Sequence, residues 1–158
     1  MEDESNYEKL REDARRFFHS IGKIHCPALN EVASFTAEGF NHLVFKTSRS
    51  ERERSSQILR FKPLPIAKDL VGLTTTYQEY EETLKEMLVK RHKRHERRPL
   101  PVRYWGLIAI LRGRKVKVIL RKVGNGQLHF WSIVPAWVTN KYRDLRFYST
   151  MKGNPDED

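Results

Sequence analysis

The spacing of apolar residues is helical up to residue 98 and close to alternating beyond residue 101. The segment 5–21 is predicted to be an amphipathic helix, because Ser5 and Glu8 form a capping box and apolar side chains follow at every third or fourth position. Gly22 is a typical helix stop. A second, shorter helix is predicted over 27–39, with a proline in its first turn and a glycine at its end.

Short elements are expected between residues 40 and 72. The apolar run 40–46 fits either a strand or one turn of helix, because a run this short carries no decisive period. The charged segment 50–60 is predicted to be helical, with Ile58 and Leu59 facing inward, and two prolines follow it. A further short helix is predicted over 66–72.

The segment 76–98 is predicted to be one long helix. Thr76 and Glu79 form a capping box, and the acidic start and basic end of the segment suit the helix dipole. Its last residues, 90–98, are the densest positive cluster of the sequence. This run is either a solvated helix end or a docking site for a polyanion.

The last third of the chain has the pattern of an antiparallel sheet. Strands are predicted over 102–111, 115–123 and 128–134, joined by an Arg-Gly turn and a Gly-Asn-Gly turn, and a short strand is expected at 146–149. Asn-Gly is the strongest short signal for a hairpin. Helices first and an antiparallel meander afterwards predict an α+β fold.

The length suits one compact domain with short appendages. Residues 1–38 are expected to form an N-terminal helical extension and residues 39–150 the basic α+β domain. The acidic segment 151–158 is predicted to be a disordered tail.

The register of the second hairpin decides which polar groups share a face. A two-residue turn pairs Arg121 with Phe130 and places Lys117, Arg121 and Ser132 together. The opposite face then carries Val116, Val118, Leu120, Trp131 and Ile133. A three-residue loop pairs Arg121 with His129 instead and sends Ser132 to the other face. The Asn-Gly turn favours the first arrangement.

The formal net charge of +10 is concentrated in the middle of the chain. Residues 1–40 hold five Lys and Arg against eight Asp and Glu, residues 41–122 hold 21 against eight, and residues 123–158 hold four of each. A segment of +13 indicates a polyanionic partner, either nucleic acid or an anionic surface, or else a solvated basic face. The residues expected to bind nucleic acid are Arg60, Lys62, Lys90, Arg91, Lys93, Arg94 and Lys117.

A basic domain with histidine, arginine, lysine and serine on a sheet face meets the needs of metal-free RNA cleavage. The 2′-hydroxyl must lose a proton, the phosphate must be stabilised and the 5′-oxygen must gain a proton. Histidine suits proton transfer, arginine and lysine hold phosphate oxygens, and a hydroxyl such as that of Ser132 can complete the hydrogen bonding. His42 and Lys46 are neighbours if 42–46 is helical and about 13 Å apart if it is a strand. His42 is either such a catalytic group or a hydrogen-bonded structural histidine.

Several other classes of protein are disfavoured. The sequence contains no Gly-rich phosphate loop, no GxSxG motif and no HExxH motif, and the basic segment lacks paired carboxylates at metal-binding spacing. The single cysteine, Cys26, excludes an internal disulfide and a Cys-rich metal site. We therefore expect no metal and no cofactor. The acidic N-terminus and the absence of a long apolar run predict a cytoplasmic chain without a membrane anchor.

The order of helices, then the motifs Gly39-Phe-Asn-His-Leu-Val-Phe-Lys46 and Arg60-Phe-Lys-Pro-Leu-Pro-Ile-Ala67, then the closing hairpin 118–135, resembles the phage-type members of the barnase–EndoU–colicin–RelE-like nuclease superfamily. The resemblance covers roughly residues 39–137. It implies a metal-independent endoribonuclease, often a toxin of a phage or mobile element. Carried over by position, the implied site residues are His42, Arg121 and Ser132, with Lys46 and His129 as further matches.

The leading hypothesis is therefore an endoribonuclease that produces a 2′,3′-cyclic phosphate, with RNA as substrate and a cognate acidic antitoxin or immunity protein as a further partner. One rival is a non-catalytic nucleic-acid-binding protein that uses tryptophan and tyrosine side chains as stacking platforms. The other is an interaction module whose basic face binds an acidic protein.

Overall fold

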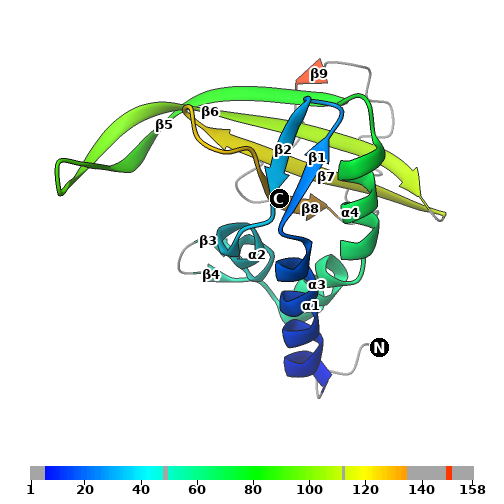
Figure 1. Ribbon diagram of the computed structural model, residues 1–158. Coiled ribbons are helices and arrows are strands. Elements are labelled where there is room, and N and C mark those ends of the chain that lie inside the picture. Colours follow the sequence, from blue (N-terminus) through cyan, green and yellow to red (C-terminus); the bar gives the residue numbers. More distant parts are fainter. Residues whose placement is uncertain (1–5, 48–49, 112, 135–148, 151–158) are drawn as a thin grey trace.

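The computed structural model describes residues 6–47, 50–111, 113–134 and 149–150, and in these residues the chain has an α+β fold (Figure 1). The helices are α1 (Tyr7–Ile21), α2 (Ala37–Val44), α3 (Arg54–Phe61) and α4 (Leu64–Leu73). The strands are β1 (Lys23–Cys26), β2 (Glu31–Ser34), β3 (Phe45–Thr47), β4 (Ser50–Glu51), β5 (Glu79–Arg91), β6 (Arg94–Leu111), β7 (Arg114–Val123), β8 (His129–Val134) and β9 (Ser149–Thr150).

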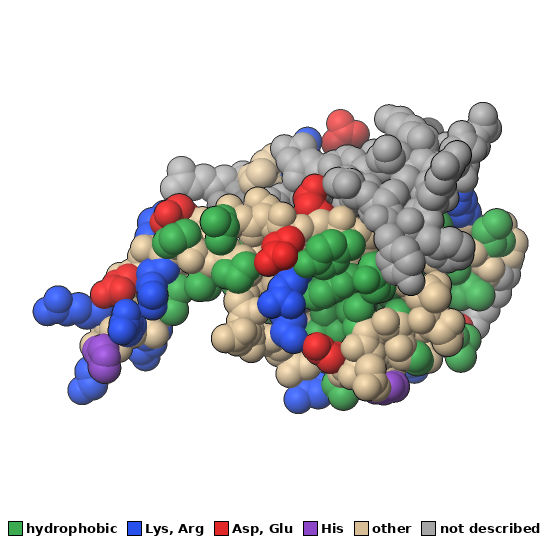
Figure 2. Space-filling model, turned by 90° about the horizontal axis from the view of Figure 1, so that it is seen from above, with side chains coloured by type: hydrophobic (Ala, Val, Ile, Leu, Met, Phe, Trp, Pro, Cys, Tyr) green, Lys and Arg blue, Asp and Glu red, His purple; other side chains and the backbone are tan. Residues whose placement is uncertain are grey.

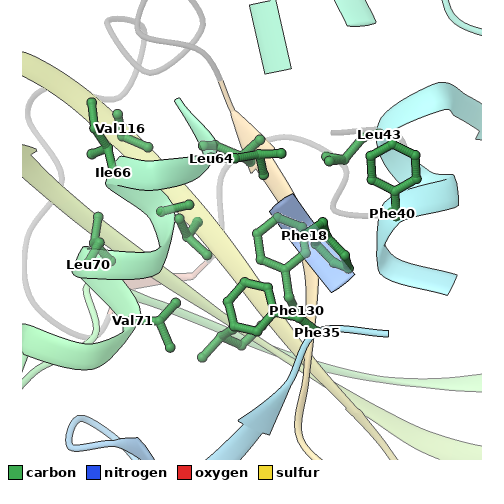
Figure 3. Close-up of a cluster of buried hydrophobic side chains, with 14 of the residues drawn as sticks. Phe18, Phe35, Phe40, Leu43, Leu64, Ile66, Leu70, Val71, Val116 and Phe130 are labelled. Carbon is green, nitrogen blue, oxygen red and sulfur yellow. The ribbon is translucent and has the colours of Figure 1, made fainter. Parts of the chain in front are cut away.

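One mostly antiparallel sheet organises the fold. Its strand order is β1-β2-β8-β7-β6-β5-β9, and β3 and β4 form a separate small ribbon. The helices cover one face of this sheet, where the main hydrophobic core lies. At the centre of the core, Phe18 of α1 contacts Phe35, Phe40 of α2 and Phe130 of β8 (Figure 3). Aromatic side chains of this size supply a large part of the burial that stabilises such a core.

The sequence predicts α1 and α4 well. The helix expected over 5–21 is found at Tyr7–Ile21, and the one expected over 66–72 begins slightly earlier, at Leu64. The helix expected over 50–60 is confirmed for its second half, where Ile58 is buried but Leu59 is exposed. The ambiguous run 40–46 divides into the end of helix α2 and the start of strand β3.

The helix predicted over 27–39 is wrong. The chain instead forms the antiparallel hairpin β1–β2 followed by the start of α2. Pro27 begins a turn rather than a helix, because the backbone N–H groups of Leu29 and Asn30 donate to the carbonyls three residues before them and Asn30 adopts a φ of 52°. A proline and an asparagine spaced in this way are typical of a turn.

The long helix predicted over 76–98 is also wrong. These residues form β5, a two-residue turn and the first part of β6, which pair from Glu79↔Gly106 to Arg91↔Arg94. Both turn residues are left-handed, with φ of 50° at His92 and 66° at Lys93. This is the geometry of a type I′ turn, which matches the twist of a hairpin but costs a residue other than glycine about 1–2 kcal/mol.

The three strands predicted after residue 101 are confirmed as part of β6, β7 and β8. The hairpin between β7 and β8 combines the two predicted registers. Next to the turn Arg121 pairs with His129, and beyond a bulge Ile119 pairs with Ser132. The bulge places Trp131 in the same cluster as Tyr104 and Ile119, on the face of the sheet opposite the main core. The prediction that Trp131 belongs to the face of Val118 and Leu120 is therefore wrong.

Residues 7–38 are part of the same core and the same sheet as the residues after them. Phe18 and Phe35 contact Phe130, and β2 pairs with β8 in parallel through Ser34 and His129. The boundary expected at residue 38 does not coincide with a gap in the packing. Within the predicted strand 146–149, only residue 149 belongs to the described residues, at the start of β9, and the predicted tail 151–158 lies outside them.

Candidate functional site

Helix α2 lies against β8 at unusually short range. A Cβ atom at Gly39 would lie 2.4 Å from the carbonyl oxygen of Phe130, so glycine is the residue that allows the helix to approach the strand this closely. One turn later, the ring of His42 stacks on the ring of Trp131, with 4.1 Å between the centroids and 21° between the planes. Helix α2 thus brings a histidine to the sheet face that the helices otherwise leave uncovered.

Arg121 of β7 is the centre of a buried polar cluster. Its Nε donates to Nε2 of His129 at 3.0 Å, and its Nη2 lies 2.7 Å from Oε1 of Glu38. Its guanidinium carbon lies 3.6 Å from the centroid of the Trp131 ring, a cation–π contact. Arg121 is 6% exposed, whereas the side chain of Glu38 is 62% exposed. The ion pair therefore reaches from the interior to solvent.

His129 is held as a neutral ring that orients Arg121. Its Nδ1 lies 3.0 Å from the carbonyl oxygen of Gln127, which can only accept, so Nδ1 carries the proton and Nε2 accepts from Arg121. Burial lowers the pKa of His129, and the positive charge of Arg121 lowers it further. Both ring nitrogens are engaged, so the arrangement suits positioning rather than proton transfer.

His42 is also neutral at physiological pH. Burial and then the positive charge of Arg52 lower its pKa to about 3, against the effect of a hydrogen bond with the Trp131 backbone. Arg52 in turn donates from Nε to the carbonyl oxygen of His42 at 3.2 Å. A neutral imidazole can accept a proton.

Two further residues, Tyr104 and Lys85, extend this cluster. Tyr104 stands opposite Arg121 in the register, and its hydroxyl accepts from Nζ of Lys85 at 2.8 Å. Burial raises the pKa of Tyr104 and lowers that of Lys85, and the charge of Arg121 lowers both. Sequence reasoning missed Glu38, although the spacing Glu38-x-x-x-His42 places both side chains on one face of a helix.

Of the five predicted site residues, the structure brings His42, Arg121 and His129 together around Trp131. Lys46 lies exposed on β3, one residue beyond the point where α2 gives way to the strand, and so is not the neighbour of His42 within one helix. Ser132 is fully buried opposite Ile119. These two placements correct the predicted five-residue site.

The residues predicted to bind nucleic acid divide into a buried group and an exposed group. Lys117 is fully buried in an ion pair with Glu79, with 2.9 Å between Nζ and Oε1, and Arg60 is buried with its Nη1 donating to Oγ of Ser56 at 3.0 Å. Neither is a surface residue, so neither placement supports the predicted contact with nucleic acid. Lys62 is exposed in the helix layer. The exposed residues Lys90, Arg91, Lys93 and Arg94 lie at the end of the β5–β6 hairpin, where basic side chains gather (Figure 2).

Within the described residues, no group of three or more His, Cys, Asp or Glu side chains is placed to hold a metal ion. Across those same residues, no helix is long and apolar enough to cross a membrane. No family model, no curated protein and no solved structure matches this chain.

Proposed function

We propose that this protein is a metal-independent endoribonuclease with the architecture of the phage-type barnase–EndoU–colicin–RelE-like nucleases. In this proposal the 2′-hydroxyl of RNA attacks the adjacent phosphate, the P–O5′ bond breaks, and the 5′-oxygen takes a proton from water and leaves as a 5′-hydroxyl, so that a 2′,3′-cyclic phosphate remains. The observation that carries the proposal is the arrangement of Arg121 between His129, Glu38 and the stacked pair of His42 and Trp131. A fixed arginine beside a neutral histidine supplies a phosphate clamp and a proton acceptor.

Each residue has a distinct part in the proposed reaction. Arg121 binds the phosphate through the nitrogen that Glu38 holds in the free protein, and His129 keeps the guanidinium in place. His42 accepts the proton of the 2′-hydroxyl, and the bound phosphate raises the pKa of His42 toward the neutral range because it adds negative charge beside the ring. Trp131 keeps these groups in place, because His42 stacks on its ring and the guanidinium carbon of Arg121 lies 3.6 Å from its centroid.

The test is cleavage of labelled RNA in excess EDTA by the wild type and by the variants His42→Gln and Arg121→Lys. Both replacements are polar and close in volume to the original side chain, and circular dichroism and thermal melting check that they fold. The matched controls are His25→Gln and Arg114→Lys, because both residues are exposed and lie outside the cluster. We expect cleavage to a cyclic phosphate that is lost in the two site variants and kept in the two controls. Wild-type protein that binds RNA without cleaving it would refute the proposal.

One observation favours a second function, that of a non-catalytic RNA-binding protein. His42 and Arg121 are at most 7% exposed, whereas the basic end of the β5–β6 hairpin is fully accessible. In that case the site variants leave RNA affinity unchanged and no cyclic phosphate forms. An acidic antitoxin or immunity protein would, in either case, be a natural partner for the basic hairpin.

A further inference from the structure

The β5–β6 hairpin extends beyond the sheet as a two-stranded arm. β7 pairs with β6 from Val102 to Leu111, so residues 84–101, called the arm below, project past the last strand that supports them (Figure 1). The arm carries seven Lys and Arg residues against two Glu, a net charge of +5 and so half of the charge of the whole chain. Charge at this density on a thin projection points to a polyanion as its ligand.

Cations occupy both faces of the arm. Paired residues of an antiparallel ladder share a face, so Arg91, Arg94 and Arg98 lie on one side, and Lys90 and Arg97 lie on the other. A strip that rests on a flat anionic surface would need cations on one side only. Cations on both sides match a ribbon laid along the wide, shallow minor groove of an A-form double helix, which has a phosphate backbone along each of its walls.

The arm also lacks the large aromatic side chains on which unpaired bases stack most strongly. Between residues 84 and 101 there is no Phe, Tyr or Trp, whereas the supported part of the sheet carries Tyr104 and Trp131 beside Arg121. Proteins that bind single strands use aromatic platforms for successive bases. High charge without Phe, Tyr or Trp therefore favours a double-stranded ligand at the arm.

The register connects the arm with the candidate site. The row Glu81, Tyr104, Arg121 and His129 crosses four strands on one face of the sheet, and Arg91 and Arg94 lie ten residues further along the same face. At about 3.3 Å per residue this is about 33 Å. That length is close to one turn of a double helix.

We propose that the arm binds double-helical RNA through its phosphate backbone and holds a flanking duplex while the adjoining strand enters the site around Arg121. This inference rests on the proposed function and names its substrate class, an RNA in which a duplex of about one turn flanks the cleaved strand. The two strands of the arm carry the phosphate contacts, and the sequence of the duplex is immaterial because no base is read.

The test is fluorescence anisotropy with a blunt RNA duplex of about 16 base pairs, its single strand and the same duplex as DNA. The arm variant combines Arg91→Gln, Arg94→Gln, Arg97→Gln and Arg98→Gln. A control with the same change of charge combines Lys9→Gln, Lys23→Gln, Lys68→Gln and Arg114→Gln, which are exposed positions outside the arm. His42→Gln is included in every protein, so that binding is measured without cleavage.

We expect the arm variant to lose about 10²-fold in affinity for duplex RNA at low salt. We also expect the slope of log affinity against log salt to become shallower by about 3.6, because each of the four lost phosphate contacts contributes about 0.9 to it. Equal losses in the control, equal losses for duplex DNA, or a loss confined to the single strand would each overturn the inference. The proposed role of the arm and the proposed ribonuclease activity can be refuted independently of each other. Unchanged duplex affinity in the arm variant overturns the role of the arm alone, while wild-type protein still cleaves RNA in the separate cleavage assay. Duplex binding that depends on the arm, together with no cleavage by the wild type in that assay, overturns the ribonuclease alone.

Discussion

The close approach of α2 to β8 predicts that Gly39→Ala destabilises the protein, although alanine is the better helix former. The added Cβ would lie 2.4 Å from the Phe130 carbonyl oxygen and 3.3 Å from Cδ1 of the Phe130 ring. Since real Cβ atoms essentially never lie within 3.0 Å of another atom, helix or strand must move by at least 0.6 Å. The obstacle is backbone, which cannot rotate away as a side chain end can.

The magnitude follows from two opposed effects. Overpacking of this kind costs about 1–3 kcal/mol. The higher helix propensity of alanine relative to glycine stabilises the helix by at most about 1 kcal/mol. The expected net loss is about 1–2 kcal/mol, which lowers the melting temperature of a chain of this length by about 2–8 °C. The matched control is Gly72→Ala in α4, where the nearest atom to an added Cβ is a methyl carbon of Ile24 at 3.4 Å, an ordinary contact.

Urea denaturation and thermal melting of the two variants measure the difference directly. We expect Gly72→Ala to be neutral or slightly stabilising and Gly39→Ala to be destabilising. The displaced helix should also carry His42 away from Trp131, so the change in tryptophan fluorescence should be larger for Gly39→Ala. A Gly39→Ala protein as stable as the wild type would show that α2 does not pack against the β8 backbone as described.

Three further predictions concern charge and backbone strain. The pKa of His42 is about 3 in the folded state and about 6.5 in the unfolded state, so the free energy of unfolding should fall by up to about 5 kcal/mol as the pH is lowered from 6.5 to 3. In urea denaturation, the stability of His42→Gln should depend less on pH than that of the wild type. Lys117→Met should cost about 3–5 kcal/mol in the same assay because it leaves the Glu79 carboxylate buried without its cation, and adding Glu79→Gln should recover much of this loss. His92→Asn with Lys93→Gly should slow amide hydrogen exchange in the arm, because it removes two strained left-handed residues.

Each of these predictions has an outcome that contradicts it. Stability falls as the pH is lowered because the unfolded state takes up the His42 proton first. An equal pH dependence of stability in wild type and His42→Gln would therefore show that His42 is not a buried neutral ring. A double variant no more stable than Lys117→Met alone would show that the stability lost does not come from the isolated Glu79. Unchanged exchange in the turn variant would mean that the turn is unstrained.

The elements that could be predicted from the sequence are those whose periodicity comes from burial. The strands β7 and β8 bury continuous apolar runs and the helix α4 buries one face, so the sequence shows each of them clearly. The arm buries little, since Met87 is its one residue packed against a cluster of buried hydrophobic side chains in the described structure. Its residues, rich in Glu, Lys and Leu, have the propensity of a helix. Tertiary pairing decides the outcome, because β7 provides a template on which β6 extends. The turn at His92 and Lys93 lacks the Asn-Gly signal that would have shown a hairpin.

The candidate site could be predicted only in part for a similar reason. His42, Arg121 and His129 stand out by residue type, and the register near the turn was one of the two that the sequence allows. The bulge that turns Trp131 toward Arg121 has no signal in a run that is apolar on both faces. Glu38 and Arg121 are 83 residues apart, and only the packing of α2 on β8 brings them together.

The late position of β8 in the chain has a consequence for synthesis on the ribosome. Phe18 and Phe35 emerge early, but Phe130, which each of them contacts, is made about a hundred residues later. Until then α1, the first hairpin and α2 have no sheet to cover, since the strand that joins them to the rest is missing. Glu38 and His42 likewise cannot form their contacts with Arg121 and Trp131 until those two residues have been made. For the proposed ribonuclease, a nascent chain is therefore inactive toward the message that encodes it until its last core strand has left the ribosome.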